Sequence, residues 1–584
     1  MKTFYFLFAR AAALGLLLGL PATLTHAQSS NLYDWAWVSR LGATALAGTT
    51  GSTLPASAGL PESIAADAAG NVLVAGRYAP DVIFDDPATP YQAVVTSLGP
   101  VPNGYLAKYS PSGTLLWSRN LTSDDAVLVR DVAVDGVGNA YVLGKYTQQL
   151  RIDGVVVATA NTNNAYFLAK ISPAGAPVWT ITIERDVASA SRFGVQRVAV
   201  DANGNSVVQG DFESQIVING ATYTGATNKL HCLMLRYNEL GATIGTAAAY
   251  TAGAEQGRVF TDIALAANGE CYLSGYIFNT ATLQFGTLPA LTSSNAYANG
   301  FLVKFDSTIN PTWMVTSTGA TGQLFYGIAI GPQGRCYAMG IFASGSIALG
   351  TQNLSVSNPQ GAAGYDIFLA RIAPSGTVES LVGGGGTGNA WGLAIGPQGE
   401  ATIGVGGGVS WGNVQLPGAK SFASNAPTGI VQLNAAGVPQ RGWQAGLPFY
   451  THAVAVDGLN RPVLAGTAGG QAPYTFGSRQ LSSPYAFNTL IARTATTALA
   501  ARPAVQVAGL AVYPNPARRV VEVRTAQAGP VTVQLLDALG RSVRTQPLGA
   551  GQTQVDLGGV APGAYTLLVQ QGEARSYRRL VVAP

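Results

Sequence analysis

Seven copies of one motif recur along most of the chain, and this repeat constrains the fold more than any other feature of the sequence. Each copy is an apolar-Ala-apolar segment, then a turn, then a second apolar segment that ends in Gly. Successive copies are 61 to 68 residues apart, and they start at Ile64, Val132, Val198, Ile263, Ile328, Leu393 and Val454. Because each copy places two strands around one turn, the repeat predicts seven similar units of antiparallel sheet.

A second pair of strands follows the first in each repeat. In several repeats a Lys stands nine residues before a Trp: Lys108 and Trp117, Lys170 and Trp179, Lys304 and Trp313. In the first two pairs a turn of the Ser-Pro-x-Gly type lies between them. A variable segment lies between the two motifs, and it usually holds an apolar residue, a Gly and a short strand, as at Phe285-Gly286 and Trp411-Gly412. We therefore expect each repeat to hold four core strands and a short inserted hairpin.

Four antiparallel strands repeated seven times is the pattern of a β-propeller. The repeats resemble the bacterial β-propeller repeat family of surface proteins, and the resemblance covers residues 32–495. It implies the fold and no particular activity.

The two ends of the repeat region predict how the ring closes. Residues 35–40 look like the Trp-bearing strand that ends each repeat, yet they precede the first copy. The seventh repeat stops after Leu490–Arg493 and has no Trp strand of its own. We expect the N-terminal strand to complete the seventh blade, which would leave no open sheet edge. An open β-solenoid is the alternative, but it has no use for a strand split in this way.

The first 27 residues have the features of a secretory signal peptide. Lys2 and Arg10 flank a short apolar start, Ala11–Leu20 are apolar, and small residues precede a predicted cleavage after Ala27. No later stretch reaches the roughly 18 apolar residues that a membrane-spanning helix needs. We expect no transmembrane segment in the mature chain.

The last 75 residues combine four motifs in a fixed order. They are Tyr513-Pro514-Asn515-Pro516, a turn at Gly540-Arg541, a strand start with Pro562, Gly563 and Tyr565, and a basic-then-apolar end at Arg579. Residues 510–584 resemble the type A C-terminal sorting domain of the type IX secretion system. The resemblance implies passage from the periplasm across the outer membrane by the type IX machinery, usually with removal of the domain and often with attachment of the cargo to the cell surface.

Alternating apolar residues in this last segment predict a small Ig-like β-sandwich. Residues 496–509, rich in Ala, read as a linker before it. The predicted fold class is therefore all-β: a seven-bladed β-propeller followed by a small sandwich.

The net charge of +4 comes from the two ends of the chain. The signal peptide carries +2, and the segment from Gly509 on has eight Arg against four acids, so the region between them carries −2. Nucleic-acid binding depends on clustered Lys and Arg, and we therefore expect no nucleic-acid partner. The 72 Gly and the 11% of charged residues suit short strands joined by tight turns.

Cysteine and histidine offer little for chemistry. The three cysteines are Cys232, Cys271 and Cys336, an odd number for a secreted protein, so one at least stays unpaired within the chain. Cys271 and Cys336 share a repeat position; a disulfide between them is one interpretation, and we favour buried small apolar residues. After loss of the signal peptide only His231 and His452 remain, and we expect no metal site from them.

Several motifs have a catalytic or metal-binding interpretation beside a structural one, and we favour the structural one for each. Gly408–Gly412 matches G-x-S-x-G but aligns with an inserted hairpin, and Gly383–Gly388 matches G-x-G-x-x-G but has no βαβ unit around it. An Asp recurs in the turns and suggests either Ca²⁺ ligands or bonds to its own turn. The residues concerned are Asp67, Asp135, Asp201 and Asp457, and a further acidic group is Asp81, Asp85 and Asp86.

No catalytic, cofactor-binding or metal-binding set of residues emerges from the sequence, and we expect no cofactor. The leading hypothesis is a secreted or cell-surface module for binding, adhesion or scaffolding, with an unknown glycan or protein ligand at the loops or at the mouth of the central channel. The alternative is a polysaccharide-degrading hydrolase or lyase at the channel mouth. An enzyme should gather acids, Arg or Tyr with perturbed carboxylates, whereas a binding protein should present an aromatic or polar face.

Overall fold

A computed structural model gives the fold. It describes residues 33–42, 60–78, 81–84, 93–96, 102–162, 165–184, 193–218, 221–224, 230–249, 258–278, 281–293, 298–319, 322–343, 345–356, 365–386, 390–416, 428–445, 449–469, 474–481, 487–498, 507–526, 529–537, 542–549, 552–571 and 574–583. The chain divides into two compact units, residues 1–498 (unit 1) and 499–584 (unit 2). Across the described residues the regular structure is β-strand, apart from one 3₁₀ turn at Pro332–Gly334.

Unit 1 contains seven antiparallel sheets of four core strands within its described residues. Sheets 1 to 4 are β2 (Leu60–Ala66), β3 (Val72–Tyr78), β6 (Asn103–Tyr109) and β7 (Leu115–Thr122); β8 (Leu128–Val134), β9 (Ala140–Tyr146), β12 (Ala165–Ile171) and β13 (Pro177–Ile183); β14 (Phe193–Val200), β15 (Ser206–Glu213), β18 (Leu230–Tyr237) and β19 (Thr243–Ala249); and β20 (Arg258–Leu265), β21 (Cys271–Ile277), β24 (Asn299–Phe305) and β25 (Pro311–Thr318).

Sheets 5 to 7 follow the same order, and the last one takes its outer strand from the N-terminus. They are β26 (Gln323–Ile330), β27 (Cys336–Ala343), β30 (Tyr365–Ile372) and β31 (Val378–Gly386); β32 (Ala390–Ile395), β33 (Ala401–Gly406), β36 (Thr428–Leu433) and β37 (Pro439–Ala445); and β38 (Phe449–Val456), β39 (Pro462–Gly469), β42 (Phe487–Ala498) and β1 (Tyr33–Gly42). The predicted completion of the last sheet by the N-terminal strand is confirmed, because β1 pairs antiparallel with β42.

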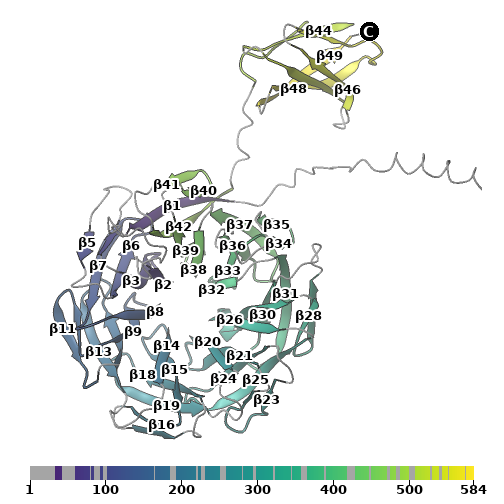
Figure 1. Ribbon diagram of the computed structural model, residues 1–584. Coiled ribbons are helices and arrows are strands. Elements are labelled where there is room, and N and C mark those ends of the chain that lie inside the picture. Colours follow the sequence, from purple (N-terminus) through teal and green to yellow (C-terminus); the bar gives the residue numbers. More distant parts are fainter. Residues whose placement is uncertain are drawn as a thin grey trace, which may run out of the picture. The chain divides into compact units, whose positions relative to one another are not determined.

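The seven sheets follow one another around a common centre (Figure 1). The first strand of each sheet is innermost and contacts the first strand of the next, and β38 contacts β2, so the series returns to its start. One hydrophobic cluster lies between each pair of neighbouring sheets, including sheets 7 and 1. Burial of apolar surface between sheets thus holds unit 1 together.

The predicted inserted hairpins occupy two kinds of position. Five of them extend the outer strand of the preceding sheet rather than their own. They are β4 (Asp81–Phe84) and β5 (Ala93–Thr96) on β1, β10 (Gln149–Ile152) and β11 (Val155–Thr159) on β7, β28 (Gly345–Leu349) and β29 (Gln352–Val356) on β25, β34 (Val409–Trp411) and β35 (Val414–Leu416) on β31, and β40 (Tyr474–Phe476) and β41 (Arg479–Leu481) on β37. Two further hairpins form small sheets, β16 (Gln215–Ile218) with β17 (Ala221–Thr224) and β22 (Thr282–Leu283) with β23 (Leu291–Thr292).

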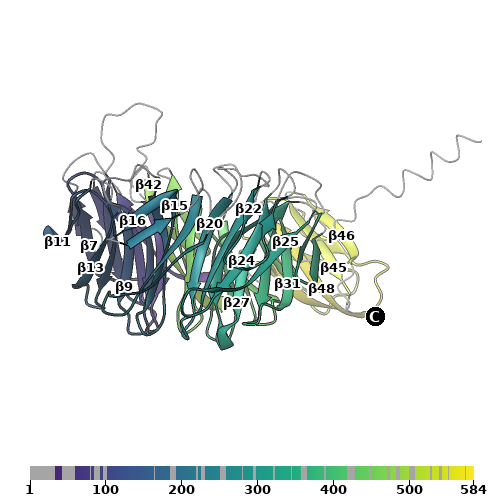
Figure 2. The same cartoon turned by 90° about the horizontal axis from the view of Figure 1, so that it is seen from below.

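The strands of unit 1 run between two faces, as the side view shows (Figure 2). The turn between the first and second strands and the turn between the third and fourth strands lie at the same face, because the pairing is antiparallel. On this face the predicted Asp turns form as expected. Asp67 accepts a hydrogen bond from Asn71 N at 2.8 Å, and Asp135 accepts one from Asn139 N at 2.9 Å. Asp201 and Asp457 do the same in their own turns, at 2.9 Å from Asn205 N and from Arg461 N.

Two Lys–Trp pairs each join one sheet to the next at this face. Lys304 and Trp313 are directly opposite in sheet 4, and both donate to the Pro374 carbonyl in the turn of sheet 5, at 3.0 Å each. Lys170 and Trp179 of sheet 2 share the Glu239 carbonyl of sheet 3 in the same way, at 3.2 and 3.1 Å. The nine-residue spacing in the sequence is therefore the signature of a contact between sheets.

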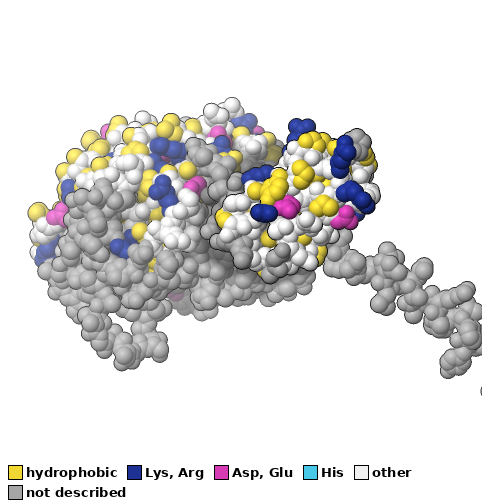
Figure 3. Space-filling view, turned by 90° about the horizontal axis from the view of Figure 1, so that it is seen from above, with side chains coloured by type: hydrophobic (Ala, Val, Ile, Leu, Met, Phe, Trp, Pro, Cys, Tyr) yellow, Lys and Arg dark blue, Asp and Glu magenta, His cyan; other side chains and the backbone are white. Residues whose placement is uncertain are grey.

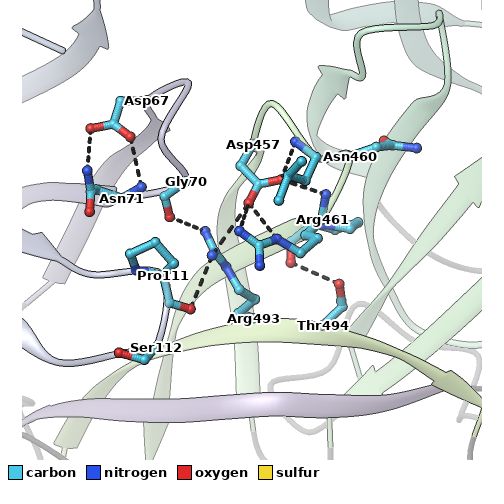
Figure 4. A network of polar contacts seen from close by, with 12 residues as sticks. Asp67, Gly70, Asn71, Pro111, Ser112, Asp457, Asn460, Arg461, Arg493 and Thr494 are labelled. Atoms are coloured by element: carbon cyan, nitrogen blue, oxygen red, sulfur yellow. Dashed lines mark hydrogen bonds and ion pairs between the residues drawn. The ribbon is translucent and has the colours of Figure 1, made fainter.

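The same contact closes the ring between sheets 7 and 1, but its two donors come from opposite ends of unit 1. Trp37 of β1 and Arg493 of β42 lie opposite each other and donate to the Pro111 carbonyl of sheet 1, at 3.0 and 3.3 Å. Arg493 also donates to the Gly70 carbonyl at 2.6 Å and pairs with Asp457 at 3.4 Å (Figure 4). We call this set of contacts the closing seam.

Unit 2 consists of two antiparallel sheets in its described residues. One has the order β43 (Ala511–Tyr513), β44 (Val520–Arg524), β47 (Gln554–Asp556), and the other β46 (Ser542–Leu548), β45 (Val531–Leu536), β48 (Gly563–Gln571), β49 (Ala574–Val582). Both sheets contribute to a single hydrophobic cluster. Lys and Arg side chains are prominent on its surface (Figure 3).

Candidate binding site

Every innermost strand carries a β-bulge at the same register. In each sheet the pairing of the first two strands skips one residue of the first strand, two positions before the start of the repeat motif. The skipped residues are Glu62, Arg130, Gln196, Thr261, Tyr326, Trp391 and His452. Bulges re-aim side chains and are common beside functional sites. We call these seven residues the bulge ring.

The bulge ring lies near the centre of unit 1, away from the face of the Asp turns. Its members sit at the beginning of the innermost strands, whereas the Asp turns follow the ends of those strands. Trp391 is 46% exposed, His452 is also exposed, and the other five are half-buried. The ring therefore offers solvent seven different side chains from seven equivalent positions.

Charged and polar groups gather where sheets 7 and 1 meet. Arg77 Nε lies 2.8 Å from Glu62 Oε1, and both side chains are about one-third exposed. His452 Nε2 lies 2.9 Å from Thr467 Oγ1. The surrounding protein and, second, the Arg77 cation lower the pKa of His452 to about 4. The imidazole is thus neutral at neutral pH and can donate one hydrogen bond and accept another.

Aromatic groups gather on sheets 4 to 6. Burial, with smaller effects of Tyr276 and Tyr365, raises the pKa of Tyr326 to about 12, so this phenol stays protonated. The Trp391 indole lies against Gly406 of the neighbouring strand, where an added Cβ would stand only 3.0 Å from Trp391 Nε1. A side chain at position 406 would crowd the indole in its present place.

In sheets 1 to 4 the residue after the bulge has a different role, because it bonds the innermost strand of a neighbouring sheet. Asp131 accepts from Val198 N of the next sheet at 3.0 Å, and Asp262 accepts from Ile328 N at 2.9 Å. Arg197, between these two sheets, donates to the Thr261 carbonyl at 3.1 Å. In sheets 5 and 6 the same position is Gly, which lets the next strand approach closely.

Both carboxylates in these ties are perturbed by burial. Burial raises the pKa of Asp131, and it raises that of Asp262 to about 6, with the Arg197 cation acting in the opposite direction in both cases. Each also accepts a second backbone N–H, from Val132 and from Ile263. Each carboxylate thus accepts hydrogen bonds from backbone N–H groups on two strands, and this structural role explains why both are buried.

The motifs singled out from the sequence fall into structural positions. Residues 408–412 belong to the β34–β35 hairpin, and residues 383–386 lie in β31, with 387–388 outside the described residues. His231 is fully buried in β18, with its ring 5.2 Å from that of Phe212. Asp81 lies in β4, while Asp85 and Asp86 fall outside the described residues. No three His, Cys, Asp or Glu side chains of the described part come together as metal ligands would.

The cysteines are buried in the core of unit 1, as expected. All three are free thiols, and Cys271 and Cys336 are at most 1% exposed. Burial raises the pKa of Cys271 to about 12 and also raises the pKa of the other two thiols. They pack as small apolar side chains in the clusters between sheets.

The sorting motif residues of unit 2 come together in part. Tyr513 ends β43, and the exposed Pro514, Asn515 and Pro516 follow it. Asn515 bonds the last strand through both ends of its amide, to the Arg579 carbonyl at 2.8 Å and to Val581 N at 2.9 Å.

The remaining predicted residues lie apart from this contact or beyond the described part. Pro562 and Gly563 lead into β48, where the Tyr565 hydroxyl donates to the Ala561 carbonyl at 2.8 Å. Ala27, Gly540 and Arg541 lie outside the described residues. Strand β42 runs to Ala498, three residues past the predicted end of the repeat region, because Ala498 pairs with Tyr33 of β1.

Comparison with known proteins identifies the C-terminal segment. Residues 511–583 match the family model of the secretion system C-terminal sorting domain. This sorting domain implies export to the cell surface or secretion, and handling by the type IX secretion machinery. The described residues include no apolar helix of the length that a bilayer span requires. No curated protein matches the chain.

The solved structures that the comparison found are distant from this chain in sequence. A Bacteroides caccae protein of unknown function is 12% identical, with a TM-score of 0.30, over 58% of this chain and 89% of that one. Virginiamycin B lyase from Staphylococcus aureus is 10% identical, with a TM-score of 0.34, over 78% of this chain and 98% of that one.

Proposed function

We propose that this chain is a binding protein of the cell surface, in which a seven-bladed β-propeller presents the bulge ring to an extracellular ligand. In this proposal residues 1–27 are a signal peptide cleaved after Ala27, residues 32–495 form the propeller, residues 496–509 link it to the Ig-like sandwich, and residues 510–584 serve secretion. The motif from Tyr513 to Pro516 and the later motif residues up to Arg579 are the part that the type IX machinery reads.

One observation carries the proposal. Seven equivalent bulges on the innermost strands hold seven different side chains, while the residues that build the fold recur from sheet to sheet. A scaffold that repeats its packing and varies its exposed central residues is suited to recognition, since polar and aromatic groups placed by rigid strands give a ligand specific contacts.

The enzyme alternative would use carboxylates at the same centre. Asp131 and Asp262 are the perturbed acids near it, and the backbone donors of neighbouring sheets already occupy them. Glycoside cleavage needs an acid and a second carboxylate that are open to the substrate. Binding without turnover is therefore the function that this arrangement supports better.

The test is a binding screen with the chain from residue 28 to 584, against polysaccharides and extracellular matrix proteins, with product analysis of the same mixtures. The matched variant carries four substitutions to Ala at once, at Glu62, Arg130, Tyr326 and Trp391. Binding of a ligand by the wild type and its loss in the variant, with an unchanged unfolding midpoint, is the expected result. Equal binding by both proteins contradicts the proposed site, and shortened polysaccharides would establish an enzyme instead.

A further inference from the structure

An unusual tryptophan marks one sector of the bulge ring. Of the eight Trp residues, four are buried, and Trp117, Trp179 and Trp313 are half-buried donors in contacts between sheets. Trp391 alone is exposed among them, at 46%, and it lies on an innermost strand rather than at an outer one. Exposed indoles are strong anchors for ligands, because they bury a large flat surface at little entropic cost.

The neighbouring bulges supply polar groups of balanced charge. Strands β32, β38 and β2 are consecutive around the ring and contact one another in turn. They place His452 next to Trp391, and Glu62 with its partner Arg77 next to His452. The carboxylate and guanidinium cancel in charge, and the imidazole is neutral, so the sector has donors and acceptors but no net charge.

These groups match the chemistry of a neutral sugar ring. A pyranose has an apolar face of C–H groups, which packs on an indole, and a rim of hydroxyls that both donate and accept. Carboxylate and guanidinium groups form the stronger, charge-assisted bonds to such hydroxyls. Because the Glu62–Arg77 pair carries no net charge, it gives a phosphate or uronate no net electrostatic attraction.

We propose that Trp391, His452 and the Glu62–Arg77 pair form a subsite for a neutral pyranose unit of an extracellular polysaccharide. The inference rests on the proposed binding function and narrows its ligand to one chemical class. Trp391 stacks on the sugar, the Glu62–Arg77 pair and His452 bind its hydroxyls, and Gly406 keeps the indole in place by leaving room for it.

Affinity gel electrophoresis of the chain from residue 28 to 584 tests the subsite. The gels contain neutral polysaccharides (starch, mannan, galactan, a β-glucan) or anionic ones (alginate, heparin). The wild type should be retarded by at least one neutral polymer and by neither anionic one. Trp391→Ala and Glu62→Gln should each weaken the retardation about tenfold or more, since hot-spot contacts carry effects of this size.

Two further variants separate recognition from folding. Gly406→Val adds a side chain against the indole without touching a ligand, and it should weaken retardation while the unfolding midpoint stays within a few degrees. Val155→Ala changes an exposed residue of the inserted strand β11, outside the bulge ring, and should leave retardation unchanged.

The outcomes distinguish the subsite from the proposed function. If only alginate or heparin retards the protein, the neutral-sugar subsite is wrong while central binding stands. If Val155→Ala weakens retardation as much as Trp391→Ala, the polymer does not bind at the bulge ring and both proposals are wrong. Retardation that none of these substitutions changes overturns both proposals. If no polymer retards the wild type, the sugar inference is wrong, and the matrix-protein arm of the binding screen then decides the proposed function.

Discussion

Replacing Trp37 and Arg493 tests whether the closing seam is what keeps the ring of unit 1 shut. Both side chains donate to the Pro111 carbonyl, but one comes from the first strand and the other from the last. Every other neighbouring pair of sheets is also joined by continuous chain, whereas this pair depends on β1 staying in place. Loss of the seam contacts should therefore free β1 before the rest of the unit unfolds.

The size of the effect follows from the contacts. Trp37→Phe keeps an aromatic ring and removes one neutral hydrogen bond, about 1 kcal/mol. Arg493→Met removes charged bonds to two carbonyls and the pair with Asp457. Breaking a buried pair costs about 3–5 kcal/mol, and we expect the lower end, because Arg461 still lies 2.7 Å from Asp457.

The double variant should lose slightly more than the sum of the single variants. Each single variant leaves the Pro111 carbonyl one donor, while the double variant leaves it neither. Neighbours that share a partner commonly couple by about 0.5–1 kcal/mol. We expect a total loss of about 4–5 kcal/mol.

The assay combines denaturant unfolding with hydrogen exchange of the β1 amides. Tryptophan fluorescence follows unit 1 alone, because all eight Trp residues precede residue 499. Exchange of the β1 amides should quicken by about 10³-fold in the double variant, since each 1.4 kcal/mol is tenfold.

A matched control exists within the same chain. Lys304→Met with Trp313→Phe removes the equivalent pair of donors from the Pro374 carbonyl, between sheets that the chain joins. This control should lower the unfolding midpoint without selective release of β1. Equal β1 exchange in the seam variant and in the control would refute the reasoning.

Further expectations concern the chain ends, the thiols and one buried acid. Deleting residues 33–40 should lower the unfolding midpoint of all of unit 1, and an unchanged midpoint would speak against ring closure by β1. Deleting residues 510–584 should trap the protein in the periplasm, as cell fractionation would reveal, while continued surface display would contradict the sorting role. Cys271 and the other two cysteines should react with a thiol reagent only after unfolding, because they are buried and their pKa values are raised. The folded pKa of Asp262 is raised to about 6, so its contribution to stability is greatest below about pH 4 and falls as pH rises to about 6. The difference in unfolding free energy between wild type and Asp262→Asn should fall over that window by at most about 3 kcal/mol. A difference that does not change with pH would contradict the raised pKa.

The strands and the ring closure could be predicted because their causes are local and repeated. Asp135 accepts hydrogen bonds from N–H groups of its own turn, so residues adjacent in the sequence determine that turn. The Lys–Trp spacing recurs for the same reason, since the two residues face each other across a hairpin. Residues 35–40 have the pattern of the Trp-bearing strand that ends a repeat, and the seventh repeat lacks this strand. Their place beside β42 could therefore be predicted.

The hairpin pairing and the bulge ring could not be predicted in the same way. Whether β10 pairs with its own sheet or with β7 of the preceding one depends on the distance between sheets, which no local pattern fixes. A bulge adds one residue to one strand, and the seven residues concerned share no chemistry, so no motif marks them. The signal that could have found them is their position, two residues before each copy of the repeat motif.

On each innermost strand the bulged residue and the residue after it explain how one fold can be both rigid and variable. The residue after the bulge bonds the next strand in sheets 2 and 4, as Asp131 and Asp262 do, and in sheets 5 and 6 it is a Gly that lets that strand approach, so packing constrains its identity there. The bulged residue takes no part in the backbone pairing of its sheet, so a change of its side chain leaves the backbone hydrogen bonds between strands in place. Substitutions at exposed positions of this kind usually alter stability by no more than about 0.5 kcal/mol. Recognition at the centre of the ring can therefore change residue by residue, while the ties next to it hold the strands at a fixed spacing.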